Sequence, residues 1–181
     1  MNLETHMRRR RDGTIVCYSV EKVLDMTDLS IVSLVRSGGQ NISESKLFVA
    51  KEPNLDVDVL TSIDSSASKD ESNTIVPIPH FFYNEASVLE LLAQHPHPAI
   101  VQLLGFVEDD EGIELHLEYV HPPEGKRNMR FEDDHELLTY AEDLASGLHH
   151  IHSLGYAHLD VKPWDALRHE KGHKLIDFAS A

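Results

Sequence analysis

The stretch that decides the fold is Gly155-Tyr-Ala-His-Leu-Asp-Val-Lys-Pro-Trp-Asp165, with Lys174-Leu-Ile-Asp-Phe-Ala179 shortly after it. Between them, 167–169 and 173–176 are short extended runs around the turn 170–172, where a glycine tolerates a positive φ. This pattern predicts a hairpin that folds the chain back on itself. Asp165, before the first strand, should then lie near Asp177, after the second.

Three carboxylates gather around the predicted hairpin, at Asp160, Asp165 and Asp177. Carboxylates in one cleft repel each other and raise each other's pKa unless a cation or a hydrogen-bond donor offsets them. Mg²⁺ is a suitable cation, particularly where phosphate oxygens supply its remaining ligands. Lys162 would add a positive charge beside a reacting phosphoryl group. The alternative interpretation is a solvated acidic loop.

The same residues carry a family resemblance. The run 158–165, His-Leu-Asp-Val-Lys-Pro-Trp-Asp, with Asp-Phe-Ala at 177–179, resembles the H-R-D-x-K-P-x-N loop and D-F-G triplet of eukaryotic protein kinases. Because several letters fall in register, the kinase interpretation is favoured over a solvated loop. The resemblance is to the serine/threonine kinases. It implies that Asp160 and Lys162 are catalytic and that Asp177 and Asp165 hold Mg²⁺.

Three letters depart from the kinase pattern. Leu159 replaces an arginine, which removes the usual contact to a phosphorylated activation loop. Asp165 replaces the metal-binding asparagine, so it adds charge and loses an amide donor. Ala179 replaces the glycine of the triplet and limits backbone freedom there.

Composition bounds the class of protein. The chain has 181 residues and a formal net charge of -15, with 31 acidic against 16 basic residues. Such a charge disfavours nucleic acid and anionic membranes as partners. Cys17 is the only cysteine, which excludes an internal disulfide and suits a reducing compartment. No apolar run has the length of a membrane span. A cytoplasmic protein is expected, with the nucleus as the alternative, acting on a protein substrate or partner.

The fold expected from the resemblance is α+β, with an antiparallel small lobe at 14–120 and a partial large lobe at 121–181. Runs of β-branched and aromatic residues at 14–25, 31–35 and 47–51 predict a three-stranded meander. Residues 1–13 are predicted to be a polar N-terminal tail. A segment at about 54–76, biased toward Ser, Asp and Glu, is predicted to be a flexible insert.

Kinases place three glycines between their first two strands, where bare backbone closes over the phosphates of ATP. The aligned run here is 24–32, Leu-Asp-Met-Thr-Asp-Leu-Ser-Ile-Val, which keeps the nucleotide-contacting Leu24 and Val32 and loses every glycine. Asp25 and Asp28 would each cost roughly 4 kcal/mol if they faced a phosphate oxygen at about 4 Å. ATP binding is therefore expected to be weak or lost.

A helix is predicted from about His80 to Gln94. Glu85 shares its apolar stripe with Phe82, Val88, Leu89 and Leu92, so its carboxylate should face the core and need a cation. Lys51 is the obvious cation, and the resemblance implies the same pair, in which Lys51 binds ATP phosphates. The run 83–98 is also similar to kinase-like proteins of filamentous fungi.

The run Ile113–Val120 alternates as a strand. By resemblance, Leu117 guards the adenine pocket, and the backbone of Glu118 and Val120 binds adenine. An amphipathic helix is predicted from Asp133 to Leu154, with Asp133 or Asp134 as its N-cap.

Three functions remain open at this stage. One is an ATP- and Mg²⁺-dependent serine/threonine kinase of poor activity. The second is a pseudokinase that binds a partner and transfers nothing. The third is a truncated kinase fragment, since by resemblance the sequence stops part-way through the large lobe and leaves the apolar face of the 133–154 helix without partners.

Overall fold

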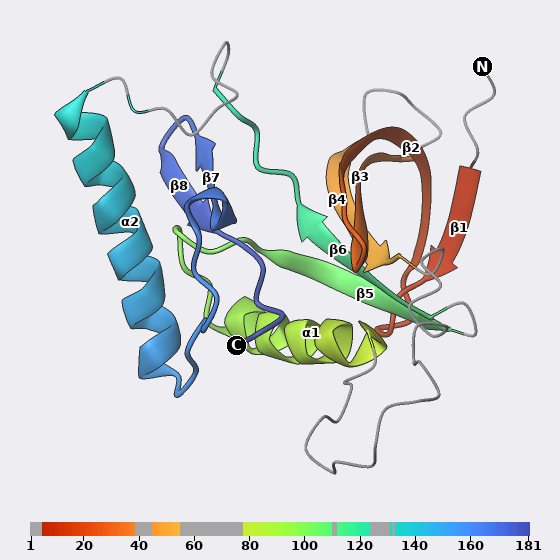
Figure 1. The fold of residues 1–181 in the computed structure, drawn as a ribbon. Coiled ribbons are helices and arrows are strands. Elements are labelled where there is room, and N and C mark those ends of the chain that lie inside the picture. The colour runs from red at the N-terminus through yellow and green to blue at the C-terminus, as the bar shows by residue number, and fades with distance from the viewer. Residues whose placement is uncertain (1–4, 39–44, 55–77, 110–111, 124–130, 132) are drawn as a thin grey trace, which may run out of the picture.

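The computed structural model describes residues 5–38, 45–54, 78–109, 112–123, 131 and 133–181. One six-stranded antiparallel sheet has the order β1-β2-β3-β4-β6-β5, and a separate hairpin pairs β7 with β8 (Figure 1). The elements in chain order are β1 Thr5–Arg9, β2 Ile15–Met26, β3 Ser30–Ser37, β4 Leu47–Pro53, α1 Ile78–Gln94, β5 Leu103–Asp109, β6 Gly112–Glu118, α2 Asp134–Ser153, the 3₁₀ turn η2 Pro163–Asp165, β7 Ala166–His169 and β8 Gly172–Leu175. This arrangement confirms the predicted α+β class.

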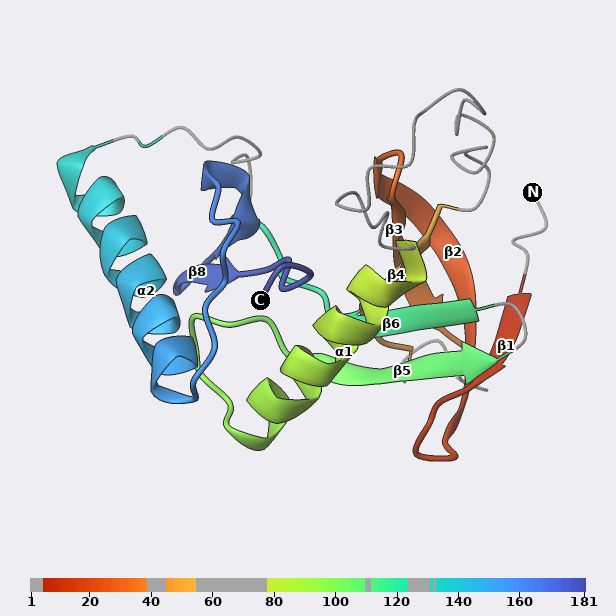
Figure 2. The same ribbon diagram turned by 60° about the horizontal axis from the view of Figure 1, so that its bottom comes forward.

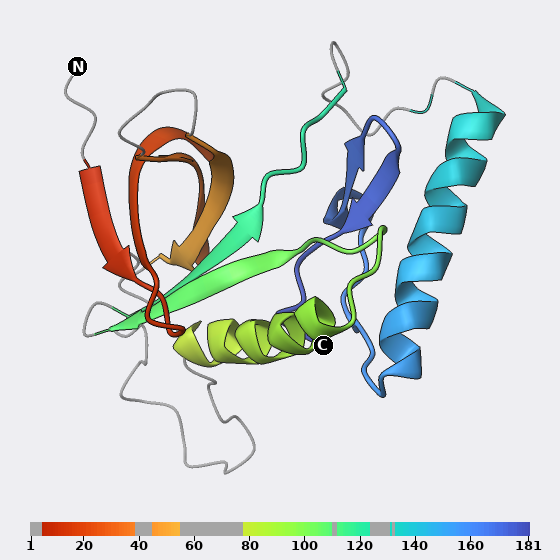
Figure 3. The same cartoon turned by 180° about the vertical axis from the view of Figure 1, so that it is seen from behind.

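The sheet curls strongly, as Figure 3 shows from behind. Two register irregularities interrupt the long strand β2, between Val20 and Lys22 and between Val23 and Asp25. Such irregularities bend a strand and increase its twist. The curl brings the two edges of the sheet together, where Arg10 forms an antiparallel bridge to Val107 of β5.

The N-terminal segment is a strand of the sheet, so the predicted polar tail at 1–13 is wrong for Thr5–Arg9. The arginines find matched acceptors. Arg8 pairs with Asp109 at 3.2 Å, and the Arg10 Nε donates to His116 Nδ1 at 2.9 Å. The Arg11 backbone N–H donates to the Phe106 carbonyl at 2.9 Å. A basic run therefore becomes an ordered strand because β5 and β6 supply acceptors for it.

Gly105 of β5 allows this close passage. Its φ is +136°, and a Cβ built on it would lie 2.8 Å from the Arg10 side chain. The position therefore suits glycine both for its backbone conformation and for the space that Arg10 fills.

A buried polar network lies inside the curled sheet. The Tyr18 hydroxyl contacts both Glu114 carboxylate oxygens at 2.7 Å, and His116 bonds to the same carboxylate. All three side chains are buried. Burial by itself would raise the pKa of Glu114, but the hydrogen bonds from His116 and Tyr18 outweigh it and hold that pKa below its usual value.

This lowered pKa predicts acid sensitivity. Because the folded pKa of Glu114 lies below its unfolded value of about 4.3, its contribution to stability is present above that pH and is lost as the pH falls further. Urea unfolding at pH 7, 4 and 3 should show a steeper acid loss for the wild type than for Glu114→Gln. Parallel pH profiles would contradict the assignment.

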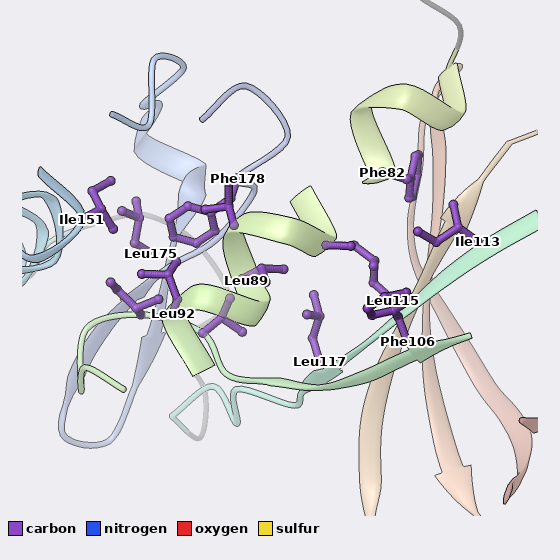
Figure 4. Close-up of a cluster of buried hydrophobic side chains, with 14 of the residues drawn as sticks. Phe82, Leu89, Leu92, Phe106, Ile113, Leu115, Leu117, Ile151, Leu175 and Phe178 are labelled. Atoms are coloured by element: carbon purple, nitrogen blue, oxygen red, sulfur yellow. The ribbon is translucent and has the colours of Figure 1, made fainter. Parts of the chain in front are cut away.

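Helix α1 packs under β5 and β6, as Figures 1 and 2 show from two directions. It begins at Ile78, two residues before the predicted start, and its predicted apolar stripe is buried, Glu85 included. Figure 4 shows Leu89 and Leu92 between the side chains of the sheet and Leu175, Phe178 and Ile151. The core therefore joins the small lobe to the first part of the large lobe.

The large-lobe elements follow the sequence prediction closely. The Asp133 carboxylate accepts from the Glu136 N–H at 2.8 Å and caps α2. The β7–β8 hairpin turns as predicted, with Gly172 at a φ of +139°. Its strand β8 is tied to the segment after α1, where the Leu175 N–H donates to the Ala99 carbonyl at 2.8 Å.

The outer face of α2 is partly uncovered. Leu137 and Leu138 are 47% and 61% exposed, whereas Ile151, Leu144 and Leu148 pack against the main core. The prediction of an apolar helix face without partners is therefore wrong for the second half of α2. The predicted insert at about 54–76 lies outside the described residues, except for Asn54. Among the helices that the structure describes, none combines the length and apolar character needed to cross a membrane.

Candidate active site

Lys51 is the centre of the site. It lies on β4, opposite Val32 of β3 and Leu115 of β6, and its ammonium group lies 2.8 and 3.0 Å from the two Glu85 carboxylate oxygens. The structure thus confirms the predicted contact between these two residues. Glu85 is almost completely enclosed, with a side chain that is 2% exposed.

The same ammonium group also contacts Asp177, which follows β8. The Lys51 Nζ lies 2.9 Å from the Asp177 Oδ1, and the Asp177 side chain is 40% exposed. One lysine therefore joins β4, α1 and the segment after β8. The two carboxylates differ in setting, because Glu85 faces the core whereas Asp177 faces solvent.

Electrostatics follow from this arrangement. Burial would lower the pKa of Lys51, but the charges of Glu85 and Asp177 outweigh it and raise that pKa. Burial raises the pKa of Glu85, and Lys51 offsets only part of that effect. Burial would raise the pKa of Asp177, but the charge and hydrogen bond of Lys51 outweigh burial and lower that pKa. The solvent-facing carboxylate is thus the one held in its charged form.

The loop between α2 and β7 carries the predicted catalytic pair. The Lys162 Nζ lies 2.5 Å from the Asp160 Oδ2, and both side chains are close to 40% exposed. The hydrogen bond to Asp160 raises the pKa of Lys162. This exposed carboxylate and its lysine can approach a molecule that enters from solvent.

Asp165 is buried at the end of η2. Its Oδ2 accepts the Lys162 backbone N–H at 2.8 Å, and its carbonyl accepts the Ile176 N–H at 2.7 Å. These bonds fix the hairpin next to Asp177, as the sequence predicts. Burial raises the pKa of Asp165, and the negative charge of Asp177 adds to that effect.

The carboxylates fit Mg²⁺ only in combination with other ligands. Within the described residues, no group of three acidic, histidine or cysteine side chains is placed to hold an ion. Asp177 and Asp165 can supply oxygens from two sides of the hairpin, and Mg²⁺ commonly takes one or two carboxylates together with substrate phosphates.

His158 and Phe178 pack in the core next to the site residues. Both are buried, their rings lie 5.1 Å apart, and the His158 Nε2 bonds to the Ile176 carbonyl at 2.9 Å. Among the described non-glycine residues, only Leu159 and Asp177 have a positive φ, 61° and 66°. Ala179 does not, so the replacement of glycine there is free of backbone strain in this conformation.

The turn between β2 and β3 stands where kinases have their glycine-rich loop. The Thr27 hydroxyl oxygen accepts the Leu29 N–H at 3.2 Å and the Ser30 N–H at 3.1 Å. Asn54 braces the turn from β4's end, donating its side-chain amide to the Thr27 carbonyl at 2.8 Å. The sequence pattern does not predict these contacts, in which the Leu29 and Ser30 amides are already bonded.

The other predicted nucleotide contacts are distributed around this turn and β6. Leu24 is exposed, and Val32 lies beside Lys51. Asp25 and Asp28 are exposed as well, so solvent screens their charges and the cost of each falls below the roughly 4 kcal/mol that applies to a carboxylate facing phosphate.

Glu118 and Val120 lie at the end of β6. The Glu118 N–H donates to the Gln102 carbonyl at 2.9 Å, and the Glu118 carboxylate accepts from Lys174 at 2.6 Å. Leu117 and Val120 are buried in the main core. Residues 117–120, which link the two lobes, are therefore fixed by hydrogen bonds to Gln102 and Lys174 and by packing in the core.

A curled antiparallel sheet, a helix that pairs its glutamate with a strand lysine, and an Asp-bearing loop and hairpin define a protein kinase architecture. The model of the protein kinase domain family matches residues 61–181. Because this match covers more than half of the sequence, the chain belongs to the protein kinase family. The match begins after β4, so Lys51 and the first four strands are assigned from the structure.

The chain is also similar to curated serine/threonine kinases. The chain is 34% identical over 107 residues to citron rho-interacting kinase of Rattus norvegicus, covering 56% of this chain and 5% of that protein. It is 35% identical over 95 residues to ribosomal protein S6 kinase 2 beta of Xenopus laevis, covering 49% and 15%. The human ribosomal protein S6 kinase alpha-1 gives 35% over 95 residues, covering 49% and 13%. The chain thus spans a small fraction of these relatives.

Proposed function

We propose that this chain binds ATP with Mg²⁺ at the site around Lys51 and Asp177 and transfers phosphate to protein serine or threonine only weakly. The single observation that carries this proposal is the contact of Lys51 with both Glu85 and Asp177. A buried ion pair beside a solvent-facing carboxylate offers a phosphate a cation and offers a metal ion an oxygen ligand. Family membership supports the same reading.

Each residue has a role in this proposal. Lys51, held by Glu85, binds the phosphates. By the family resemblance, the Glu118 carbonyl and the Val120 N–H receive adenine, whereas the Glu118 N–H is bonded to Gln102. Leu24 and Val32 would cover the base.

The reacting end is assigned to the loop before η2. Asp177 and Asp165 hold Mg²⁺, which offsets the negative charge of the phosphates. Asp160 orients the substrate hydroxyl and accepts its proton, and Lys162 lies beside the transferred group.

The braced turn supports weak binding. In kinases the free backbone amides of this loop close over phosphate, whereas here Thr27 accepts the Leu29 and Ser30 amides. Leu159 is 78% exposed and offers no charge to a phosphorylated segment. The same two features favour the alternative function, an interaction module without phosphoryl transfer.

Thr27→Ala is expected to raise the affinity for ATP. Removing the hydroxyl frees two amides, each bond being worth about 1 kcal/mol, so ATP should bind up to about thirtyfold more tightly while the free energy of unfolding falls by about 2 kcal/mol. Isothermal titration with ATP and with adenosine separates the effects, because adenosine has no phosphate to gain. Thr27→Ser, which keeps the hydroxyl, is the matched control. An equal gain for adenosine would contradict the assignment.

Phosphoryl transfer tests the catalytic part of the proposal. The wild type, Asp160→Asn and Asp177→Asn are incubated with radiolabelled ATP, Mg²⁺ and a mixture of serine- and threonine-containing peptides. A low transfer rate that disappears in both variants supports a weak kinase. Nucleotide binding without any transfer supports the interaction module, and transfer that persists in Asp160→Asn would sink the proposed role of that residue.

A further inference from the structure

Asn84 of α1 grips the segment that follows Asp177. Its side-chain amide nitrogen donates to the Ala179 carbonyl at 3.0 Å and to the Ala181 carbonyl at 2.8 Å. Both acceptors are backbone oxygens, so the orientation of the amide is settled by the bonds themselves, since its own oxygen could not make them. Neither hydrogen of the amide is left for another partner.

The neighbouring residue holds the same segment from a second direction. The Glu85 carboxylate binds the Lys51 ammonium group, and the nearby Phe178 backbone N–H helps to lower the pKa of Glu85 against the effect of burial. Two consecutive residues of α1 therefore face the segment around Phe178. The C-terminal segment accordingly lies against α1 in Figure 1.

The backbone at Asp177 has a conformation that surrounding contacts must stabilise. Asp177 has a φ of 66°, in the left-handed region that disfavours residues with a side chain. Residues in that region persist where the surrounding structure fixes them. The Ala181 N–H also closes a turn onto the Phe178 carbonyl at 3.1 Å, and Asn84 binds the open side of this turn.

We propose that Asn84 is a positioning residue, which fixes the turn after Asp177 and so holds the Asp177 carboxylate where Mg²⁺ is bound. Asn84 acts through the backbone, because its amide bonds to the Ala179 and Ala181 carbonyls. The inference rests on the proposed function, since it names the residue that tunes metal affinity at the same site. It also ties the position of α1 to that of Asp177.

The experiment uses the full chain with Asn84→Ala and Asn84→Asp. Aspartate keeps the shape of the side chain but presents oxygens to two carbonyls, so it should be the worse of the two. Ser87→Ala is the matched control on the same helix, because the Ser87 hydroxyl bonds only within α1, to Tyr83. Amide hydrogen exchange reports on residues 177–181 without nucleotide, and titration with ATP, with Mg²⁺ or with EDTA, reports on the metal.

Loss of two bonds predicts exchange about tenfold faster in 177–181 for Asn84→Ala. The gain in ATP affinity given by Mg²⁺ should shrink by a similar factor, while ATP affinity in EDTA stays unchanged. Unchanged exchange would overturn the inference, and so would faster exchange with an intact Mg²⁺ effect. A wild type that binds no ATP would instead overturn the proposed function, and exchange alone would then decide whether Asn84 holds the turn.

Discussion

Lys51→Met is expected to lower the free energy of unfolding by about 3 kcal/mol, because it leaves the buried Glu85 carboxylate without its cation. For a chain of this length the loss corresponds to a fall in Tm of roughly 10 °C. Methionine keeps much of the volume of the lysine stem, so the loss reports on charge rather than on packing. Urea and thermal unfolding of the ligand-free chain measure it.

The partner variants sharpen this prediction. Glu85→Gln should cost less, since Lys51 keeps Asp177 at 2.9 Å, and the double variant should recover part of the loss because no buried charge remains. The pKa of Glu85 is already raised by burial, so its protonated form stabilises the fold at low pH, and that contribution is lost as the pH rises. The penalty of Lys51→Met should therefore be smaller at pH 5 than at pH 8. Equal penalties for both single variants at every pH would contradict this account.

Deletion of residues 1–11 is expected to destabilise the chain by roughly 4 kcal/mol or more, since buried polar groups left without partners cost about 1–3 kcal/mol each. The deletion removes β1, the Arg10 bond to His116 and the Arg11 bond to Phe106. It also opens the interior that holds Tyr18 and Glu114. Thermal unfolding and near-ultraviolet circular dichroism would follow the loss.

A matched pair of point variants separates the strand from a solvated tail. Arg9 is exposed, whereas Arg10 donates to the buried His116 and lies over the Phe48 ring at 6.0 Å. Arg9→Ala should therefore change stability by less than about 0.5 kcal/mol, as surface substitutions usually do. Arg10→Ala should lower it clearly. A deletion variant as stable as the wild type would show that the segment contributes nothing to the fold.

The part of the site that depends on local pattern could be predicted from the sequence. The stripe of α1 placed Glu85 toward the core, and a buried carboxylate requires a cation, which identified Lys51. The turn at Gly172 and the cap at Asp133 likewise depend on neighbouring residues alone. These features were predicted because their causes lie within a few residues or on one helix face.

The parts that were missed depend on distant partners. Thr5–Arg9 becomes a strand because the curl of the sheet brings β5 beside it, and no local signal in a run of arginines indicates that. A weak signal was present in His116, which alternates with apolar residues on a buried strand and so needs a partner. The role of Asn84 has no local signal, since its acceptors lie 95 and 97 residues away.

The central claim is that the site around Lys51 binds ATP with Mg²⁺. Its most direct test is the Tm of the wild type and of Lys51→Met, each with ATP and Mg²⁺, with Mg²⁺ alone and with neither. At 100 times its dissociation constant, ATP should add about 2.7 kcal/mol to the stability of the wild type, and nothing to the variant. A cooperative wild-type transition that ATP and Mg²⁺ leave unmoved would contradict the claim.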